Sequence, residues 1–151
     1  MVLSEKETLL LKDLMNAEEL CIQKYSRGVT EAKDAALSRL CSEIEAAEST
    51  HLQTLTDISN GNTPQMNASS GKSQQKDESP KPVSTGKAAP SDAFLCNDLL
   101  TAEKYASALY DTGIFEFREN ATRSALNHIQ KEEQEHGKKL YDYMTAHAIY
   151  G

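Results

Sequence analysis

Two short segments of the sequence place a carboxylate and an imidazole at the same spacing. Glu48 is followed three residues later by His51, and Glu133 is followed three residues later by His136. On a helix, residues three apart share a face, so each pair can direct an oxygen and a ring nitrogen toward one metal ion. In helical bundles with paired metals, two helices each supply a Glu-x-x-His pair and two others each supply one Glu. The two pairs therefore predict a metal site that needs two further glutamates.

Both pairs interrupt apolar faces of predicted helices. At about 100° per residue, the second pair shares a stripe with Leu126, Ile129, Leu140 and Tyr143. The first pair shares a stripe with Leu37, Leu40, Ile44, Leu55 and Ile58. Neighbouring acids fall outside these stripes, so Glu132 and Glu135 are interpreted as surface charges.

Two single glutamates occupy similar positions on two other predicted helices. Glu18 lies on the face formed by Leu11, Leu14, Cys21 and Tyr25, and Glu103 lies on the face formed by Leu95, Cys96, Leu99, Ala106 and Tyr110. A shift of 85 positions superimposes Glu18 on Glu103 and carries the first Glu-x-x-His pair onto the second. The chain is thus two copies of one helical hairpin, with six candidate metal ligands: Glu18, Glu48, His51, Glu103, Glu133 and His136.

The residue types of these six positions suit two divalent first-row metal ions, iron or manganese. Tyr25 and Tyr110 each follow a candidate glutamate by seven residues, so they are either ordinary core tyrosines or hydrogen-bonding partners that orient the carboxylates. A metal-free bundle with a hydrogen-bonded polar core is the alternative to the metal site. Because a duplicated hairpin repeats its own pattern, the two halves are not independent evidence.

The first hairpin is predicted to span about residues 4–58. Ser4 followed by Glu7 is typical of a capping box, so a helix is expected from there to about residue 32, with Gly28 inside it or at its end. Asp34 is the predicted N-cap of the second helix, which ends near residue 58.

The second hairpin is predicted to span about residues 91–147. Ser91 or Asp92 is expected to cap its first helix, which Gly113 interrupts near the end, and Asn120 is expected to cap its second. Residues 59–90 are rich in Gly, Ser, Asn, Gln, Lys and Pro, which predicts a flexible linker long enough to cross a bundle. The fold class expected is therefore an all-α antiparallel four-helix bundle, a single domain over residues 1–151.

The composition excludes several classes of function. A net charge of −7 argues against a nucleic-acid-binding protein, which needs a basic face. No apolar run approaches a membrane span, and the N-terminus lacks the pattern of a signal peptide, so a soluble protein made in the cytoplasm is expected. Cys21, Cys41 and Cys96 lie at apolar helical positions, which favours buried free thiols over disulfides.

Three segments of the sequence carry a resemblance to a known family: Ile129 to Met144, IQKEEQEHGKKLYDYM, which is the most specific, the Leu-Ser-Glu-Lys-Glu-Thr start and the later Asp-Leu-Met-Asn-Ala-Glu-Glu segment. In these segments the sequence resembles the coat F family of spore coat proteins. The resemblance implies a ferritin-like bundle in the coat of a bacterial endospore, and by wider similarity to ferritin-like proteins the six candidate ligands match that group's metal motif. The chain departs from the family at Gly28 and in its Ala-Ile-Tyr-Gly ending.

The resemblance leads to a first hypothesis and two others. The first is a spore coat protein with a buried di-metal site, which associates with other coat proteins. The second is an oxidase-like or catalase-like enzyme that acts on oxygen or peroxide through the same metals. Iron storage is the least favoured. The long linker leaves open a homodimer and an exchange of hairpins between chains.

Overall fold

The computed structural model describes residues 1–64 and 87–149. Over this part of the chain it contains four long helices, α1 (Glu5–Glu31), α2 (Ala35–Ser59), α3 (Pro90–Glu116) and α4 (Asn120–Ala146). Most of the predicted linker, residues 65–86, lies outside the described residues, so its predicted flexibility is not described. None of the described helices is long and apolar enough to cross a membrane.

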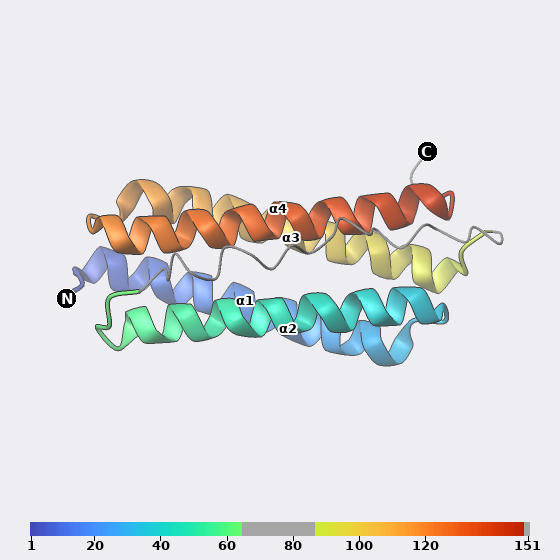
Figure 1. Cartoon of the computed structure of the whole chain (residues 1–151), viewed down its shortest axis with the longest axis horizontal. Helices are drawn as coiled ribbons and strands as arrows, with labels where there is room; N and C mark the ends of the chain where they lie inside the picture. The colour runs from blue at the N-terminus through green and yellow to red at the C-terminus, as the bar shows by residue number, and fades with distance from the viewer. Residues whose placement is uncertain (65–86, 150–151) are drawn as a thin grey trace, which may run out of the picture.

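The four helices form a bundle of two antiparallel hairpins, α1 with α2 and α3 with α4 (Figure 1). Helix α1 also packs against α3, and α2 against α4. Helix α2 ends at the end of the bundle where the chain begins, whereas α3 begins at the opposite end (Figure 1). The connection between the hairpins therefore joins opposite ends of the bundle. The predicted all-α four-helix architecture is confirmed.

The apolar core is divided into two clusters, with the polar side chains of the predicted site between them. One cluster contains Leu11, Leu14, Leu55, Ile58, Tyr110, Phe117, Ala125, Leu126 and Ile129. The other contains Tyr25, Leu37, Cys41, Ile44, Cys96, Leu99, Leu100, Leu140 and Met144. All three cysteines are buried free thiols, as predicted. Burying a Leu or Ile side chain contributes about 1.5–3 kcal/mol, so the two clusters can stabilise a bundle whose centre is polar.

Each hairpin is also fastened to the turn of the other hairpin by a buried acid. Asp92 at the start of α3 accepts hydrogen bonds from the backbone N–H groups of Lys33 (2.9 Å) and Asp34 (3.0 Å), between α1 and α2. Glu7 at the start of α1 accepts one from the backbone N–H of Arg118 (3.1 Å), between α3 and α4. Glu7 and Asp92 are 85 positions apart, as are Lys33 and Arg118. The sequence repeat is thus a repeat of contacts, related by an approximate twofold axis.

In the first hairpin, the predicted helix starts agree with the structure. Ser4 and Glu7 form the capping box that begins α1, and the side chain of Asp34 accepts a hydrogen bond from the Ala36 N–H at the start of α2. Helix α1 continues through Gly28 to Glu31.

In the second hairpin, the predicted caps are wrong. Helix α3 begins at Pro90 with Ala89 as its N-cap, because proline suits a first turn in which its missing N–H is not needed. Asp92 is already inside the helix and bonds to the other hairpin. Helix α3 also continues through Gly113 to Glu116, and Glu119 rather than Asn120 is the N-cap of α4.

Two glycines at equivalent positions of the repeat have different surroundings. A Cβ atom at Gly28 would lie 2.7 Å from Cys41 Sγ, so the Cys41 side chain or the helix that carries it would have to shift. A Cβ atom at Gly113 would lie 3.5 Å from Leu126 Cδ1 and Leu14 Cδ1, an ordinary contact. The first glycine therefore permits a close approach of α1 and α2, whereas the second is not needed for packing.

Alanine substitutions of the two glycines should change stability in opposite directions. Gly28→Ala should destabilise the fold by about 1–3 kcal/mol through overpacking against Cys41. Gly113→Ala should stabilise it by up to about 1 kcal/mol, because alanine is the better helix former. Urea unfolding measures both, and Cys41→Ala combined with Gly28→Ala should recover part of the loss. Equal effects of the two substitutions would contradict the close approach at Gly28.

The contacts of Glu7 predict a stability that depends on acid pH. Burial alone would raise the pKa of Glu7, but hydrogen bonds from the Ser4 and Arg118 backbone N–H groups outweigh it and lower the pKa to about 2. A carboxyl whose pKa falls on folding stabilises the native state above its ordinary pKa, near 4.5, and this contribution is lost as the pH falls toward 2.

Glu7→Gln should therefore cost about 1–3 kcal/mol at pH 7, and the difference from the unsubstituted protein should shrink between about pH 4.5 and pH 2. Urea unfolding as a function of pH measures the difference. Glu5→Gln is the matched control, since Glu5 is an exposed acid in the same helical turn. A loss that stays constant down to pH 2 would exclude the charge as its cause.

Candidate metal centre

The six predicted ligands meet in the middle of the bundle, between the two apolar clusters. Each of the four helices supplies a buried carboxylate, and α2 and α4 each add an imidazole. All six are buried, and the most exposed of them is His136, with 5% of its surface accessible to solvent. Their potential ligand atoms fall into two groups, Glu18, Glu48, His51 and Glu133 in one, and Glu48, Glu103, Glu133 and His136 in the other. Within each group these atoms lie within 4.8 Å of one another.

The two groups define two adjacent positions that share a pair of carboxylates. The first position is lined by Glu18 and His51, and the second by Glu103 and His136. Glu48 and Glu133 belong to both positions. Each of these two glutamates has two carboxylate oxygens, so it can serve both positions at once, as bridging carboxylates do in paired-metal bundles.

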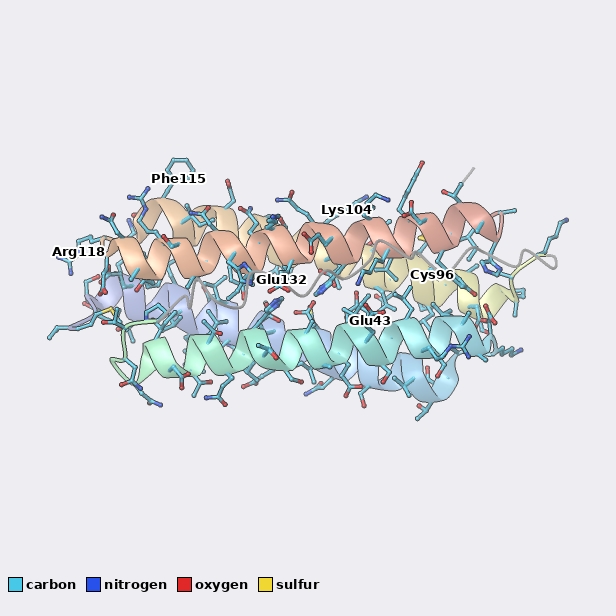
Figure 2. The ribbon with its side chains drawn as sticks, in the orientation of Figure 1. Glu43, Cys96, Lys104, Phe115, Arg118 and Glu132 are labelled. Atoms are coloured by element: carbon cyan, nitrogen blue, oxygen red, sulfur yellow. The ribbon has the colours of Figure 1, made fainter. Side chains whose placement is uncertain are left out.

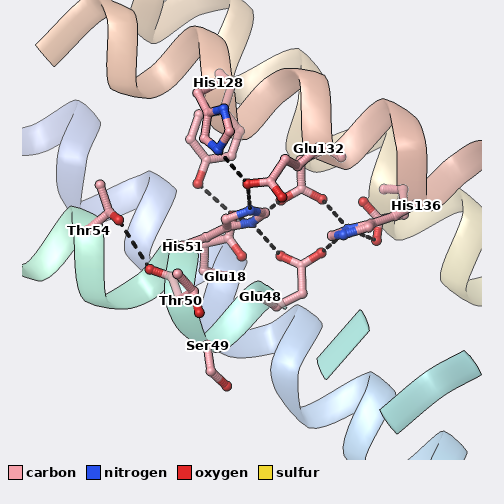
Figure 3. A network of polar contacts seen from close by, with 12 residues as sticks. Glu18, Glu48, Ser49, Thr50, His51, Thr54, His128, Glu132 and His136 are labelled. Carbon is pink, nitrogen blue, oxygen red and sulfur yellow. Dashed lines mark hydrogen bonds and ion pairs between the residues drawn. The ribbon is translucent and has the colours of Figure 1, made fainter. Parts of the chain in front are cut away.

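Both imidazoles direct Nδ1 into the site. His51 Nδ1 lies 3.3 Å from Glu48 Oε2 and 3.2 Å from Glu133 Oε1. His136 Nδ1 lies 3.0 Å from Glu48 Oε1 and 3.4 Å from Glu103 Oε1. Figure 3 shows Glu48 between the two rings, with one oxygen toward each. Nδ1 is therefore the nitrogen that each histidine offers to a bound ion.

Two buried tyrosines hold the outer carboxylates from the opposite hairpin. Tyr25 on α1 donates to Glu103 Oε1 on α3 at 2.6 Å, and Tyr110 on α3 donates to Glu18 Oε1 on α1 at 2.6 Å. Burial and the adjacent carboxylates raise the pKa of both tyrosines well above the ordinary value, so the hydroxyls remain protonated donors. Each hairpin thus orients a carboxylate of the other hairpin.

The pKa values of the four carboxyls divide into two pairs. Burial raises the pKa of Glu18 to about 12, and the Glu48 and Glu133 carboxylates add to the rise. Burial likewise raises the pKa of Glu103 to about 9, against an opposing hydrogen bond with His136. Burial alone would raise the pKa of Glu48 and Glu133 as well, but hydrogen bonds with the two histidines outweigh it, so both pKa values lie below the ordinary range.

The two histidines balance the charge of the site. Burial alone would lower the pKa of each ring, but contacts with the surrounding carboxyls raise the pKa of His51 to about 12 and that of His136 to about 11. The six candidate ligands are then neutral in sum at pH 7, with two carboxylates, two carboxylic acids and two imidazolium rings. This neutrality depends on four protons, one each on Glu18, Glu103, His51 and His136.

Two divalent cations fit the same site and the same charge balance. Four ionised carboxylates would offset two such ions, which would take the place of the four protons on Glu18, Glu103, His51 and His136. Three buried carboxylate oxygens, Glu18 Oε2, Glu103 Oε2 and Glu133 Oε2, have no hydrogen-bond partner among the described residues. An unpaired buried acceptor is unfavourable, and a cation would satisfy it. The donor set of carboxylate oxygen and imidazole nitrogen suits iron or manganese.

The interpretation of Glu132 as a surface charge is wrong. Its side chain is one third exposed (33%), and its Oε1 lies 3.2 Å from His51 Nε2 and 2.8 Å from His128 Nε2. Figure 2 shows Glu132 midway along α4, on the side toward α2, and Figure 3 shows the contacts with both histidines. Contact with His51 lowers the pKa of Glu132, which therefore remains ionised. Glu135 is exposed, as predicted.

Periodicity alone could not identify this contact. Glu132 lies 100° from Glu133 but only 40° from His136 in a helical projection, at the edge of the buried stripe, and it reaches His51 because α2 passes close to that edge of α4. The signal in the sequence was the doubled acid, Glu132 next to Glu133, where the first hairpin has Ala47 next to Glu48. Periodicity could not predict the contacts of Glu7 and Asp92 either, because these contacts join different hairpins.

Comparisons with known proteins agree with this structure. Residues 91–150 match the model of the Coat F domain. A search of curated proteins finds no match. Among solved structures, the bacterioferritin-related protein from Bacteroides fragilis, described as a dodecameric thioferritin, is similar over 95% of this chain and 87% of that chain, with a TM-score of 0.70 and 19% identity. At this identity the likeness concerns the fold alone. Residues 91–150 are therefore similar to the Coat F domain, and the chain as a whole adopts a ferritin-like fold.

Proposed function

We propose that this protein is a spore coat component that binds two divalent first-row metal ions, iron or manganese, in the centre of its bundle. The observation that carries the metal proposal is the pair of adjacent four-residue groups that share Glu48 and Glu133. The unpaired carboxylate oxygens in the same groups support it. The spore coat assignment is supported by the Coat F domain over residues 91–150 and by the resemblance of the sequence to coat F proteins.

Each residue of the site has a distinct task under this proposal. Glu48 and Glu133 bridge the two positions, while Glu18 with His51 and Glu103 with His136 complete one position each. Tyr25 and Tyr110 hold the outer carboxylates by one oxygen, which leaves the other oxygen free to bind. Bound iron or manganese would supply redox chemistry toward oxygen or peroxide, so consumption of either by the loaded protein would add an enzymatic activity to the coat role.

Metal content should distinguish shared ligands from unshared ones. Protein loaded anaerobically with Fe²⁺ or Mn²⁺ and then desalted should contain about two equivalents by elemental analysis. His51→Ala should leave about one equivalent, because only the first position loses a ligand. Glu48→Ala or Glu133→Ala should lose most of both metal equivalents, because both positions use these residues.

Thermal unfolding provides the second measurement of this prediction. A ligand at about 100 times its dissociation constant stabilises the native state by about 2.7 kcal/mol per site, so the melting temperature should rise with metal. Circular dichroism of each variant checks that it is folded. A melting temperature that neither metal changes, together with substoichiometric metal in the unsubstituted protein, would rule out the site.

The cellular location is a separate prediction. A fluorescent fusion of the full chain, expressed in a sporulating bacterium, should collect around the forming spore, and the chain should be recovered in the coat fraction of purified spores. The same fluorescent protein without this chain is the control, and it should remain diffuse. A fusion that remains diffuse in the cytosol would leave the metal site standing and remove the coat role.

A further inference from the structure

The two histidines of the site have different surroundings on their outer edges. His51 Nε2 is 3.2 Å from Glu132 Oε1, so a carboxylate lies within hydrogen-bond distance of the nitrogen that points away from the site. Among the described residues, the polar contacts of His136 are all made by its Nδ1, and none is made by its Nε2. The six ligands follow the repeat, but this outer contact does not.

The sequence repeat explains the difference. His51 corresponds to His136, and under the same shift of 85 positions Glu132 corresponds to Ala47. A residue at 132 on α4 contacts the ring from α2, so the equivalent contact for the α4 ring would come from position 47 on α2. Alanine has no polar atom to make it. The asymmetry is therefore built into the side chains and does not depend on the conformation of a loop.

We propose that Glu132 is a positioning residue for the first metal position and that it makes this position, Glu18 with His51, bind metal more tightly than the second. This inference rests on the metal-binding function proposed above. Metal-binding histidines commonly donate their other ring N–H to a carboxylate, which fixes the tautomer and ring orientation and increases the basicity of the ligand. Glu132 is placed to accept a hydrogen bond from the Nε2–H of His51, so Nδ1 is the nitrogen that would exchange its proton for the ion.

The structure also holds Glu132 in place for this role. His128 Nε2 contacts the same Oε1 atom at 2.8 Å, from one helical turn earlier on α4. The carboxylate is thus flanked by His51 on the inner side and by the more exposed His128 on the outer side (Figure 3). An exposed acid with no task would be expected to extend into solvent, since isolated surface ion pairs contribute little.

Stepwise metal titration tests the proposal. Mn²⁺ is added to the full-length protein without metal, and free Mn²⁺ is measured by electron paramagnetic resonance. The unsubstituted protein should bind its two ions with distinguishable affinities. Glu132→Ala should weaken the tighter one by about 10- to 100-fold and leave the weaker one nearly unchanged. Glu132→Gln, which keeps an oxygen acceptor, should lose less than Glu132→Ala does.

A matched control separates positioning from general electrostatics. Glu135→Ala removes the same charge from an exposed position on the same helix, three residues further on. It should change both affinities by less than about twofold, because exposed charges are screened. A loss in Glu135→Ala equal to that in Glu132→Ala would overturn the proposal.

Combining Glu132→Ala with loss of either histidine identifies the position that Glu132 serves. In His136→Ala, where the first position remains intact, Glu132→Ala should keep its full effect on the remaining ion. In His51→Ala, where the first position has lost its ring, Glu132→Ala should have little further effect. Equal effects in the two backgrounds would show that Glu132 does not act through His51.

The outcomes for the two proposals are distinguishable. An unsubstituted protein that binds no Mn²⁺ overturns both the metal site and this inference. Binding of two ions that Glu132→Ala does not alter overturns the positioning role alone and leaves the metal site intact. Circular dichroism and the melting temperature of metal-free Glu132→Ala check that any lost affinity does not come from unfolding.

Discussion

The charge balance in the centre of the bundle constrains the rest of this structure. Four carboxyls and two imidazoles lie between two apolar clusters, where an uncompensated ion costs several kcal/mol. Protons on Glu18, Glu103, His51 and His136 can achieve neutrality, and so can two divalent cations. Glu18 Oε2, Glu103 Oε2 and Glu133 Oε2 accept no hydrogen bond from the N–H and O–H groups of the described residues, so each needs a proton or a cation as its partner. A cation would satisfy both requirements, which is the physical reason to regard the cluster as a binding site.

The two hairpins complete each other. Tyr25 bonds to Glu103 and Tyr110 bonds to Glu18, so neither hairpin supplies both members of either pair. Asp92 and Glu7 likewise accept hydrogen bonds from backbone N–H groups in the turn of the opposite hairpin. A hairpin alone would expose its apolar residues to water and leave its buried-site carboxyls without these partners, which favours pairing with a second copy. The duplication of the hairpin in one chain supplies that second copy at high effective concentration.

Helical periodicity predicted the fold and the placement of the six candidate ligands, because both depend on which face of a helix a residue occupies. Glu18 and Glu133, for example, fall in apolar stripes and are buried in the structure. Contacts that depend on how helices cross were not predictable in this way. Glu132 lies at the edge of its stripe and Asp92 looked like a helix cap, yet Glu132 contacts His51 of α2 and Asp92 contacts the turn between α1 and α2. Gly28 and Gly113 are identical in pattern, and only the position of Cys41 gives the first a packing role.

The ligands retain the symmetry of the repeat, whereas their surroundings do not. An ancestral pair of identical hairpins would give two equivalent metal positions, each with the same outer contacts. In this chain the second hairpin has Glu132 where the first has Ala47, and the first has Cys41 against Gly28 where the second has Leu126 against Gly113. Substitutions of residues that contact a ligand can alter the orientation and basicity of that ligand without changing the donor set. Divergence after duplication can therefore make two chemically identical ligand sets bind metal unequally, and the outer contact of His51 is the point in this structure where that difference is visible.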